Sequence, residues 1–372
     1  MNPRVFTVVT FKNEESIEMK SQTLVKVLGV FVLLFGVVLA LSVVGTAGRA
    51  APLQAKGQAN NNAADYKISG PYTHNNLAVF LIHGKDKLAG KTFLTLQEAL
   101  RQRKVVVYET RNVNELAIEN LSRYEEVYVQ SGDIVKGGQQ DRMLGVDLIV
   151  PPRSGKISIA AFCVEHGRWT KRGKEEVTRF TSSNERVATK ELKLAANKTK
   201  SQGEVWKRVA EAQDKLSSNL GAPVTAPVSD SSFQLTLENP KVQETADAYV
   251  KALAHVADNE RDVIGYAFAI NGKINSADVY AANALFRKLW PSLLKASAVE
   301  AIAELQKDQK FERVSPADVD EFLDDAETGA ATEKDVTKRV QMVTRESKVN
   351  ILFETRDRSA SGAWLHRSYI KK

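Results

Sequence analysis

Short apolar runs of strand length, separated by turns, fill the sequence between residues 77 and 164. Leu77–His83 is one continuous apolar run, and residues 104–110 and 124–129 are further extended segments. Only residues 95–103 place apolar side chains on one helical face, behind a capping box. Strands that lack helical crossovers pair as antiparallel hairpins and meanders. This constraint predicts a mainly antiparallel sheet.

The rest of the chain carries both helical and extended patterns. Apolar residues recur at helical spacing over residues 202–216, 240–258 and 281–307. We expect Pro291 to kink or interrupt the last of these helices. Asn271-Gly272 separates two extended runs and predicts a hairpin with a type I′ turn. Further strands are expected at residues 336–343, 349–355 and 363–370. The predicted fold class is α+β, with a mainly antiparallel β-sheet core and several packed helices.

Two segments have no regular period. Residues 170–201 are polar and charged, and we expect them to run over the surface as a long excursion. Residues 324–333 are acidic and small, which predicts a loop. Residues 66–372 as a whole are expected to form a single α+β domain.

The N-terminal segment indicates the compartment. Residues 27–45 contain no charged residue, follow two lysines and lead into small residues. This order is typical of a secretory signal peptide, although such a run could also span a bilayer as an uncleaved anchor. We expect residues 1–50 to be the signal peptide or anchor, with Met19 as a candidate start, and residues 51–65 to be a flexible linker. The protein is therefore expected outside the cytoplasm, as a secreted, periplasmic or membrane-anchored chain.

Charge and cysteine usage exclude several classes of site. The net charge of +7 over 372 residues is a mild excess, and the sequence has no run of five basic residues. Because binding to a nucleic-acid backbone needs a continuous basic stripe, we expect no nucleic-acid partner. The histidines are far apart and Cys163 is the only cysteine, so we expect no metal and no cofactor. Cys163 itself is expected to be a buried, inert thiol.

Two dense sets of polar residues follow two of the predicted strands. Residues 132–142 read Gly-Asp-Ile-Val-Lys-Gly-Gly-Gln-Gln-Asp-Arg, and residues 165–169 read Glu-His-Gly-Arg-Trp. Neighbouring strands usually pair, so we expect both sets to meet at one edge of a small sheet. The sequence therefore predicts a site at that edge.

The residue types in these two sets are those that bind anions. Backbone amides at a Gly-Gly pair can approach a ligand closely, a guanidinium can hold a carboxylate or phosphate with two hydrogen bonds, and an indole can stack on a ring. The predicted ligand-binding residues are Gly137, Gly138, Gln140, Arg142, Arg168 and Trp169. A structural role is the alternative, in which Arg168 pairs with Glu165 or Asp133 and His166 is exposed.

The same segments resemble a known family. Residues 132–142, 163–169 and the later Gln202-Gly203-Glu204-Val205-Trp206 resemble the poorly characterised ADP-ribosylglycohydrolase and rhodanese-phosphatase associated domain, over residues 72–294. That name records an association with ADP-ribose and phosphate-ester chemistry and gives no mechanism. The resemblance implies that the three motifs assemble into one site.

Two functions remain open at this point. A binding or interaction module for an anionic, nucleotide-like or glycan-like ligand is favoured, because no pair of nucleophile and base is evident. The alternative is a hydrolase of a phosphate ester or glycosidic bond, with Glu165 and either Asp133 or Glu204 as acid and base. A purely structural envelope protein is a third reading. The expected partner is a small anionic ligand or a protein, and only the N-terminal apolar segment would contact a membrane.

Overall fold

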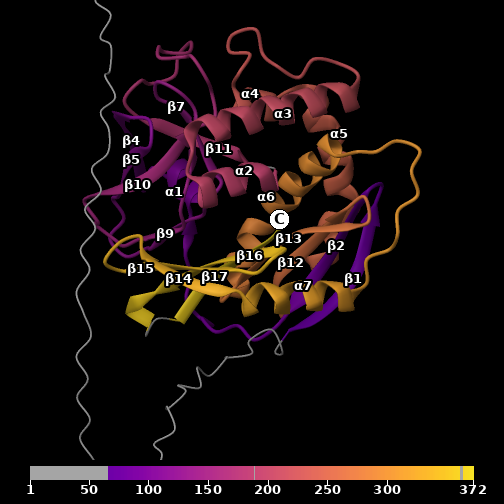
Figure 1. Ribbon diagram of the computed structural model, residues 1–372. Coiled ribbons are helices and arrows are strands. Elements are labelled where there is room, and N and C mark those ends of the chain that lie inside the picture. Colours follow the sequence, from indigo (N-terminus) through magenta and orange to yellow (C-terminus); the bar gives the residue numbers. More distant parts are fainter. Residues whose placement is uncertain (1–65, 188, 361–362) are drawn as a thin grey trace, which may run out of the picture. The chain divides into compact units, whose positions relative to one another are not determined.

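The computed structural model describes residues 66–187, 189–360 and 363–372, which lie within one compact unit of residues 59–372 (Figure 1). The predicted signal peptide or anchor, its candidate start and the whole predicted linker lie outside the described residues. The strands are β1 (Lys67–His74), β2 (Leu77–His83), β3 (Leu94–Thr95), β4 (Val105–Asn112), β5 (Glu115–Asn120), β6 (Val127–Val129), β7 (Asp133–Gly137), β8 (Arg142–Leu144), β9 (Leu148–Val150), β10 (Lys156–Cys163), β11 (Phe180–Arg186), β12 (Val263–Ile270), β13 (Lys273–Tyr280), β14 (Ala330–Asp335), β15 (Val340–Glu346), β16 (Asn350–Asp357) and β17 (Ala363–Lys371). The helices are α1 (Leu96–Arg101), α2 (Lys190–Leu194), η2 (Ala195–Thr199), α3 (Gln202–Leu220), α4 (Phe233–Leu237), α5 (Pro240–Leu253), η3 (Ala254–Ala257), α6 (Asn283–Ala303), α7 (Pro316–Thr328) and η4 (Arg358–Ala360).

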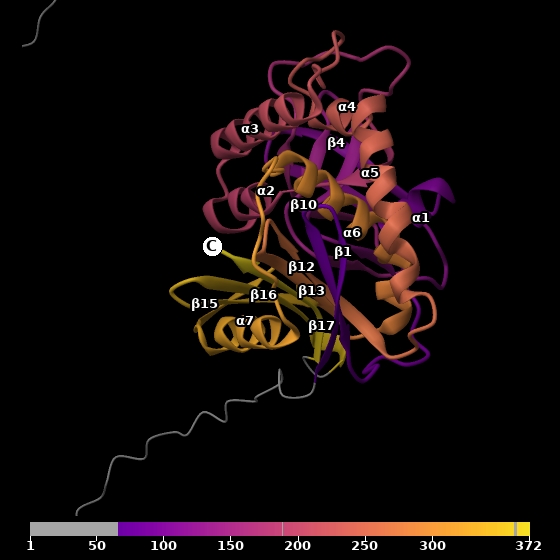
Figure 2. The same ribbon diagram turned by 90° about the vertical axis from the view of Figure 1, so that its right-hand side faces the viewer.

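The largest sheet is covered on both faces. Its strand order is β1-β2-β12-β13-β17-β16-β15-β14, with α7 against one face and α6 against the other (Figure 2). Successive residues of a strand point to opposite faces. Val79 and Leu81 of β2 therefore join the core that contains α6, whereas Phe80 and Ile82 join the core that contains α7. Burial on both sides explains why β2 is continuously apolar.

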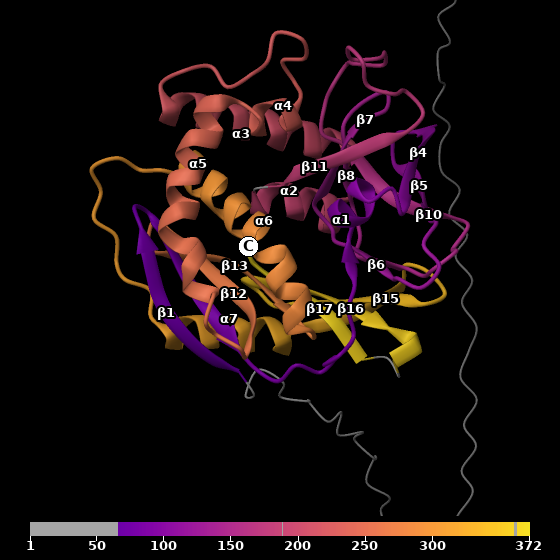
Figure 3. The ribbon, with the colours of Figure 1, turned by 180° about the vertical axis from the view of Figure 1, so that it is seen from behind.

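A second sheet holds the motif segments. Its strand order is β11-β7-β8-β10-β5-β4. A third, small sheet has the strand order β3-β6-β9, and its strands are interspersed along the chain with those of the second sheet. Figures 1 and 3 show the strands β4, β5 and β10 together, on the side of the unit away from β1. Every pairing among the described strands is antiparallel except that of β3 with β6. The predicted α+β class with a mainly antiparallel core is confirmed.

Local sequence signals account for several elements. α1 begins at the predicted capping box, in which the Thr95 hydroxyl accepts from the Glu98 amide and the Glu98 carboxylate accepts from the Thr95 amide. β12 and β13 form the predicted hairpin, and both turn residues, Asn271 and Gly272, have the positive φ that a type I′ turn requires. The three strands expected at the end of the chain are β15, β16 and β17, each shifted by a few residues.

Two predictions about irregular segments were wrong. Residues 170–201 contain β11, which pairs with β7, and also α2, so they are not one long surface excursion. Residues 324–333 contain the end of α7 and most of β14. Both strands lie at a sheet edge and have few apolar side chains, so no periodic pattern marks them. Pro291 lies inside α6, which is uninterrupted because apolar residues on both sides of the proline pack into the core.

Among the described residues, we find no helix whose length and apolar character would let it cross a bilayer.

Candidate functional site

The two predicted motif segments meet, as expected. The Arg168 side chain donates to the Glu165 carboxylate, with Nε to Oε1 at 2.6 Å and Nη2 to Oε2 at 2.8 Å. It also reaches the carbonyl oxygens of Gly138 at 3.3 Å and Gly137 at 3.4 Å. The Asp141 amide donates to Glu165 Oε2 at 3.0 Å. The segment after β10 therefore packs directly on the β7–β8 turn.

A further arginine, which was not singled out from the sequence, lies at the centre of these contacts. Arg172 binds Asp141 with two hydrogen bonds of 2.8 and 2.9 Å, and Glu175 with a contact of 2.9 Å. Its Nη1 lies 3.4 Å from Glu165 Oε1. We call this group the arginine network, consisting of Asp141, Glu165, Arg168, Arg172 and Glu175 together with the serines Ser229 and Ser232, which donate to its carboxylates.

The two central carboxyl groups of the arginine network respond differently to burial: burial raises the pKa of Asp141 despite its bonds to Arg172, whereas the pKa of Glu165 is lowered. Burial disfavours the ionised form of Glu165, but hydrogen bonds from Arg168 and Ser229 outweigh burial and lower the pKa of this carboxyl group. A general acid needs a raised pKa, so the direction of the shift does not suit Glu165 for that role. The arrangement is what a buried structural ion-pair network requires.

Arg142 lies in a separate buried group. Its side chain is fully buried, and its Nη1 donates to Cys163 Sγ at 2.6 Å and to Gln140 Oε1 at 3.2 Å. Its Nη2 lies 3.4 Å from Glu109 Oε2. Burial raises the pKa of the Cys163 thiol to about 11, which fits the expected inert thiol. A ligand would have to compete with these internal partners for the Arg142 guanidinium.

The glycine pair in this turn has a packing role. Gly138 has a φ of +57°, and a Cβ atom there would come within 2.4 Å of the Phe180 ring. Gly137 has a φ of +116°, and its amide donates to Asp141 Oδ1 at 3.0 Å. Both positions therefore favour glycine for the local backbone, and Gly138 also needs it for packing against Phe180 of β11.

The other candidates are dispersed. Asp133 is held by Arg186 at 2.6 Å, whereas Glu204 pairs with Arg208 on the surface of α3 at 2.7 Å. The three carboxylates considered for hydrolysis, which include Glu165, thus pair with different arginines. His166 is exposed, as in the structural alternative, and Trp169 is 48% exposed.

A second cluster of buried charges forms where β13 and β17 meet the β8–β9 connection. His366 Nδ1 lies 2.6 Å from Asp147 Oδ2, and His366 Nε2 lies 3.1 Å from Asp278 Oδ1. Burial opposes the charged imidazolium, but the two carboxylates outweigh it and raise the pKa of His366 to about 9. We call this group the histidine cluster, consisting of Gln130, Asp147, Lys193, Asp278 and His366.

The histidine cluster surrounds a small cavity. The cavity has a volume of about 30 Å³, which is enough for a water molecule. Asp278 Oδ2 is buried in its wall and has no hydrogen-bond partner among the described residues, and Lys193 Nζ lies 3.7 Å from it. The members come from five separate segments of the chain, and each has other polar residues near it in the sequence, so local spacing gives no signal.

A larger groove adjoins this region through Met342, which lines both the cavity and the groove. The groove has a volume of about 400 Å³, and two exposed lysines, Lys200 and Lys334, line it together. Burial and the nearby Lys334 ammonium group lower the pKa of Lys200. We call this feature the lysine groove; its apolar wall consists of Val146, Leu148, Ile159, Phe162, Val336 and Met342. The sequence analysis did not find it.

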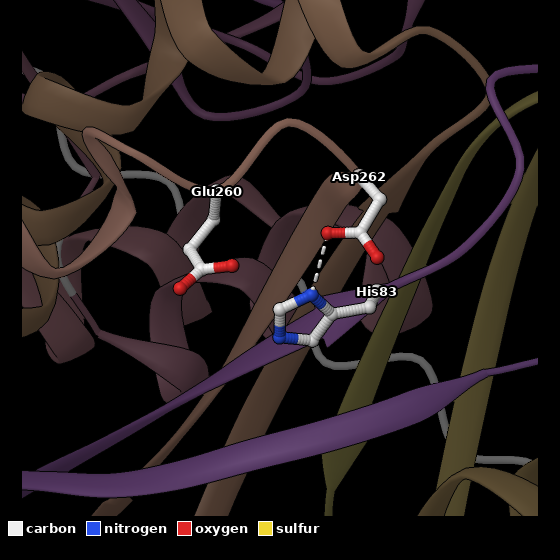
Figure 4. Close-up of side chains that lie close together, drawn as sticks. All are labelled: His83, Glu260 and Asp262. Carbon is white, nitrogen blue, oxygen red and sulfur yellow. Dashed lines mark hydrogen bonds and ion pairs between the residues drawn. The ribbon is translucent and has the colours of Figure 1, made fainter.

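One further group of side chains has the types and spacing to hold a metal ion. His83, Glu260 and Asp262 come together at one end of the largest sheet (Figure 4). Sequence spacing does not reveal the group, because His83 and Asp262 are 179 residues apart.

The comparisons with known proteins identify one family. The family described as the ARG and Rhodanese-Phosphatase-superfamily-associated Protein domain matches residues 65–370. The match therefore extends beyond the expected residues 72–294 and includes the C-terminal strands. Comparison with curated proteins and with solved structures found no match. Since the match covers most of the sequence, the chain belongs to the family of ARG and Rhodanese-Phosphatase-superfamily-associated Protein domains.

Proposed function

We propose that this protein binds a small anionic molecule with an apolar or ring-bearing part, in the lysine groove. The observation that carries the proposal is the convergence of Lys200 and Lys334 on one groove with a mostly apolar wall. Pockets for small ligands combine such a wall with a few placed polar groups. The volume of about 400 Å³ falls in the range of these pockets.

The charge of the groove supports an anion as the ligand. Within the described residues, neither Lys200 nor Lys334 forms an ion pair with a carboxylate. Two neighbouring ammonium groups repel each other, and an anion between them would relieve that repulsion. Glu115 and Asp335 also line the groove, but Asp335 is engaged by Arg358. The lysine pair is therefore the natural place for a phosphate or carboxylate group.

The apolar wall supports a ligand that is larger than an inorganic ion. Phe162 and Met342 offer a flat ring and a flexible thioether, which suit contact with a base or another ring. The family name associates the domain with ADP-ribose and phosphate-ester chemistry, which makes nucleotide-like phosphates the first class to test. The proposed ligand belongs to the class expected from the sequence, but its proposed site is the lysine groove instead of the two motif segments.

Thermal denaturation of residues 59–372 would test the proposal, with ADP-ribose, AMP, ribose 5-phosphate, an acidic sugar and inorganic phosphate as ligands. A ligand that binds only the native state must raise the melting temperature. We expect at least one organic phosphate to do so, and the Lys200→Ala/Lys334→Ala double variant to lose the shift.

The matched control is Lys307→Ala/Lys310→Ala, which removes the same charge from two exposed lysines outside the groove. This control should keep the shift. Loss of the shift in an Arg168→Ala variant, with retention in the groove variant, would place the ligand at the motif segments instead. No shift with any ligand would overturn binding of this class and favour a protein partner.

We also propose that the chain acts outside the cytoplasm. The support is the uncharged segment of residues 27–45, which follows two lysines and precedes small residues. N-terminal sequencing of the protein from fractionated cells would locate it. Cleavage near residue 50, or an intact chain in the membrane fraction, would agree with export, whereas an intact chain in the cytoplasmic fraction would contradict it.

A further inference from the structure

Strand pairing brings His83, Glu260 and Asp262 together. His83 is the last residue of β2 and lies opposite Val263, the first residue of β12. Asp262 directly precedes β12, and Glu260 lies in the turn before it. One ligand atom from each of the three side chains lies within 4.8 Å of the others. Figure 4 shows the Asp262 carboxylate beside the imidazole Nδ1 and the Glu260 carboxylate facing the ring edge between the two nitrogens.

We propose that His83, Glu260 and Asp262 form a binding site for a divalent transition-metal ion. The site goes beyond the proposed ligand groove and uses none of its residues. One imidazole nitrogen and two carboxylates are ligands that Zn²⁺, Mn²⁺ and Co²⁺ accept. A site with three protein ligands leaves a coordination position open for water or for a ligand group.

The distances suit a single ion after small side-chain movements. His83 Nδ1 lies 2.8 Å from Asp262 Oδ1. Ligand atoms that bind one ion at about 2.0–2.2 Å lie roughly 3 to 3.5 Å apart. The side chain of Asp262 is 63% exposed and Glu260 is half-buried, so both can close around an ion without repacking the core.

The surroundings of the imidazole fit a metal ligand. His83 Nε2 lies 2.7 Å from Ser69 Oγ on β1. When Nε2 carries the proton and donates it to Ser69, the lone pair of Nδ1 is available to an ion that binds between the imidazole and the Asp262 carboxylate. Metal-bound histidines commonly donate their other ring nitrogen in this way, which fixes the ring. The His83 side chain is only 8% exposed, so its ring is already held in place.

The turn that carries Glu260 is also held. The Arg287 guanidinium donates to the carbonyl oxygens of Ala257 and Asp258, and also to that of Glu260. These bonds fix the backbone without using the Glu260 carboxylate. Lys67 is a further positive charge close enough to act on Asp262. It competes with a bound cation, so we expect micromolar rather than nanomolar affinity.

Isothermal titration of the full metal-free chain with Zn²⁺ alone, and the absorption spectrum of the chain with Co²⁺, would test the site. We expect one ion per chain at neutral pH and a Co²⁺ spectrum of low coordination number. Glu260→Gln and Asp262→Asn preserve side-chain shape and should each weaken binding by about tenfold or more, and Ser69→Ala should weaken it about tenfold.

The control is Glu244→Gln/Asp247→Asn, which alters two exposed acids on α5 and should leave affinity unchanged. Circular dichroism of each variant would verify that it is folded. Absence of stoichiometric binding would overturn the proposal. Affinity that is equal in the control and in the folded Glu260→Gln and Asp262→Asn variants would also overturn it, because the ion would then bind elsewhere.

Discussion

The arginine network and the histidine cluster are both buried groups of charges, but they are built in opposite ways. The arginine network draws its charged members from residues 141–175, and its acids and arginines pair with one another. The histidine cluster joins residues 130, 147, 193, 278 and 366, and it surrounds a cavity whose wall contains an Asp278 oxygen that accepts no hydrogen bond from the described residues. The charged groups of the arginine network are paired with one another, whereas the histidine cluster can accept one more hydrogen bond.

This difference shows why a dense polar motif need not be a ligand site. Burying an unpaired charge is costly, so a motif that packs several charges into the interior must pair them internally. Arg168 and Arg172 are used in this way by Asp141 and Glu165. A ligand gains more from charges that lack an internal partner, such as the lysines of the groove. Four predictions test the contrast.

The largest effect should come from Arg172→Ala in the arginine network. The variant leaves Asp141 and Glu165 buried beside fewer positive charges, and we expect a loss of about 3–5 kcal/mol in the free energy of unfolding. Urea denaturation of residues 59–372 would measure it. Arg208→Ala breaks only partly exposed pairs on α3 and should cost about 1 kcal/mol or less. Equal losses of unfolding free energy in the two variants would contradict a structural role for the arginine network.

The histidine cluster should make stability depend on pH. The folded pKa of His366, about 9, lies above its unfolded value of 6.5, so the stabilisation is full below pH 6.5 and is lost as pH rises through 9. We expect a fall of about 3 kcal/mol across this window. Urea denaturation at several pH values would follow it. His366→Gln should be less stable at pH 6, and its stability should be nearly constant from pH 7 to 9, above the window in which Glu300 titrates; a steep fall from pH 7 to 9 in that variant would assign the effect to another group.

Glu300, which anchors the helix that carries Lys193, should also make stability fall as pH rises, but its substitution should stabilise the protein, whereas substitution of His366 should destabilise it. Burial, and then the charge of Glu191, raise the pKa of Glu300 to about 7. Its Oε1 accepts from the Lys190 amide at the start of α2 and from Asn275. The folded pKa exceeds the unfolded value of 4.5, so stability is lost as pH rises from 4.5 through 7.

Glu300→Gln keeps an oxygen acceptor and removes the charge. We expect it to stabilise the protein by about 2–3 kcal/mol at pH 8 and to have little effect at pH 4.5. Thermal or urea denaturation at the two pH values would measure the difference. A destabilised variant at pH 8 would mean that the ionised carboxylate is needed for α2.

The smallest effect should come from Trp169→Ala. Its side chain is 48% exposed, so we expect the free energy of unfolding to change by less than about 0.5 kcal/mol. Urea denaturation would measure the stability, and the thermal shift with organic phosphates would measure binding. An unchanged shift would agree with the lysine groove, whereas a lost shift would support stacking at the motif segments.

Local and pairwise signals in the sequence determined much of the fold. The apolar run of β2, the capping box of α1 and the Asn271-Gly272 turn each specify their element within a few residues. The meeting of the two motif segments also followed, because β7, β8 and β10 are close in sequence and pair in one sheet. These features rest on short-range propensity and periodicity, which a single sequence displays.

Only the tertiary structure located the edge strands β11 and β14. It alone also located three features that join distant segments, which are the histidine cluster, the lysine groove and the group of His83, Glu260 and Asp262. His366 and Asp147 are 219 residues apart, Lys200 and Lys334 belong to different elements, and His83 reaches Asp262 only through the pairing of β2 with β12. No local pattern encodes such contacts, because they depend on which strands pair and on which side chains those pairings bury. The sequence determined where polar residues are dense, and the fold decided which charges have partners and which do not.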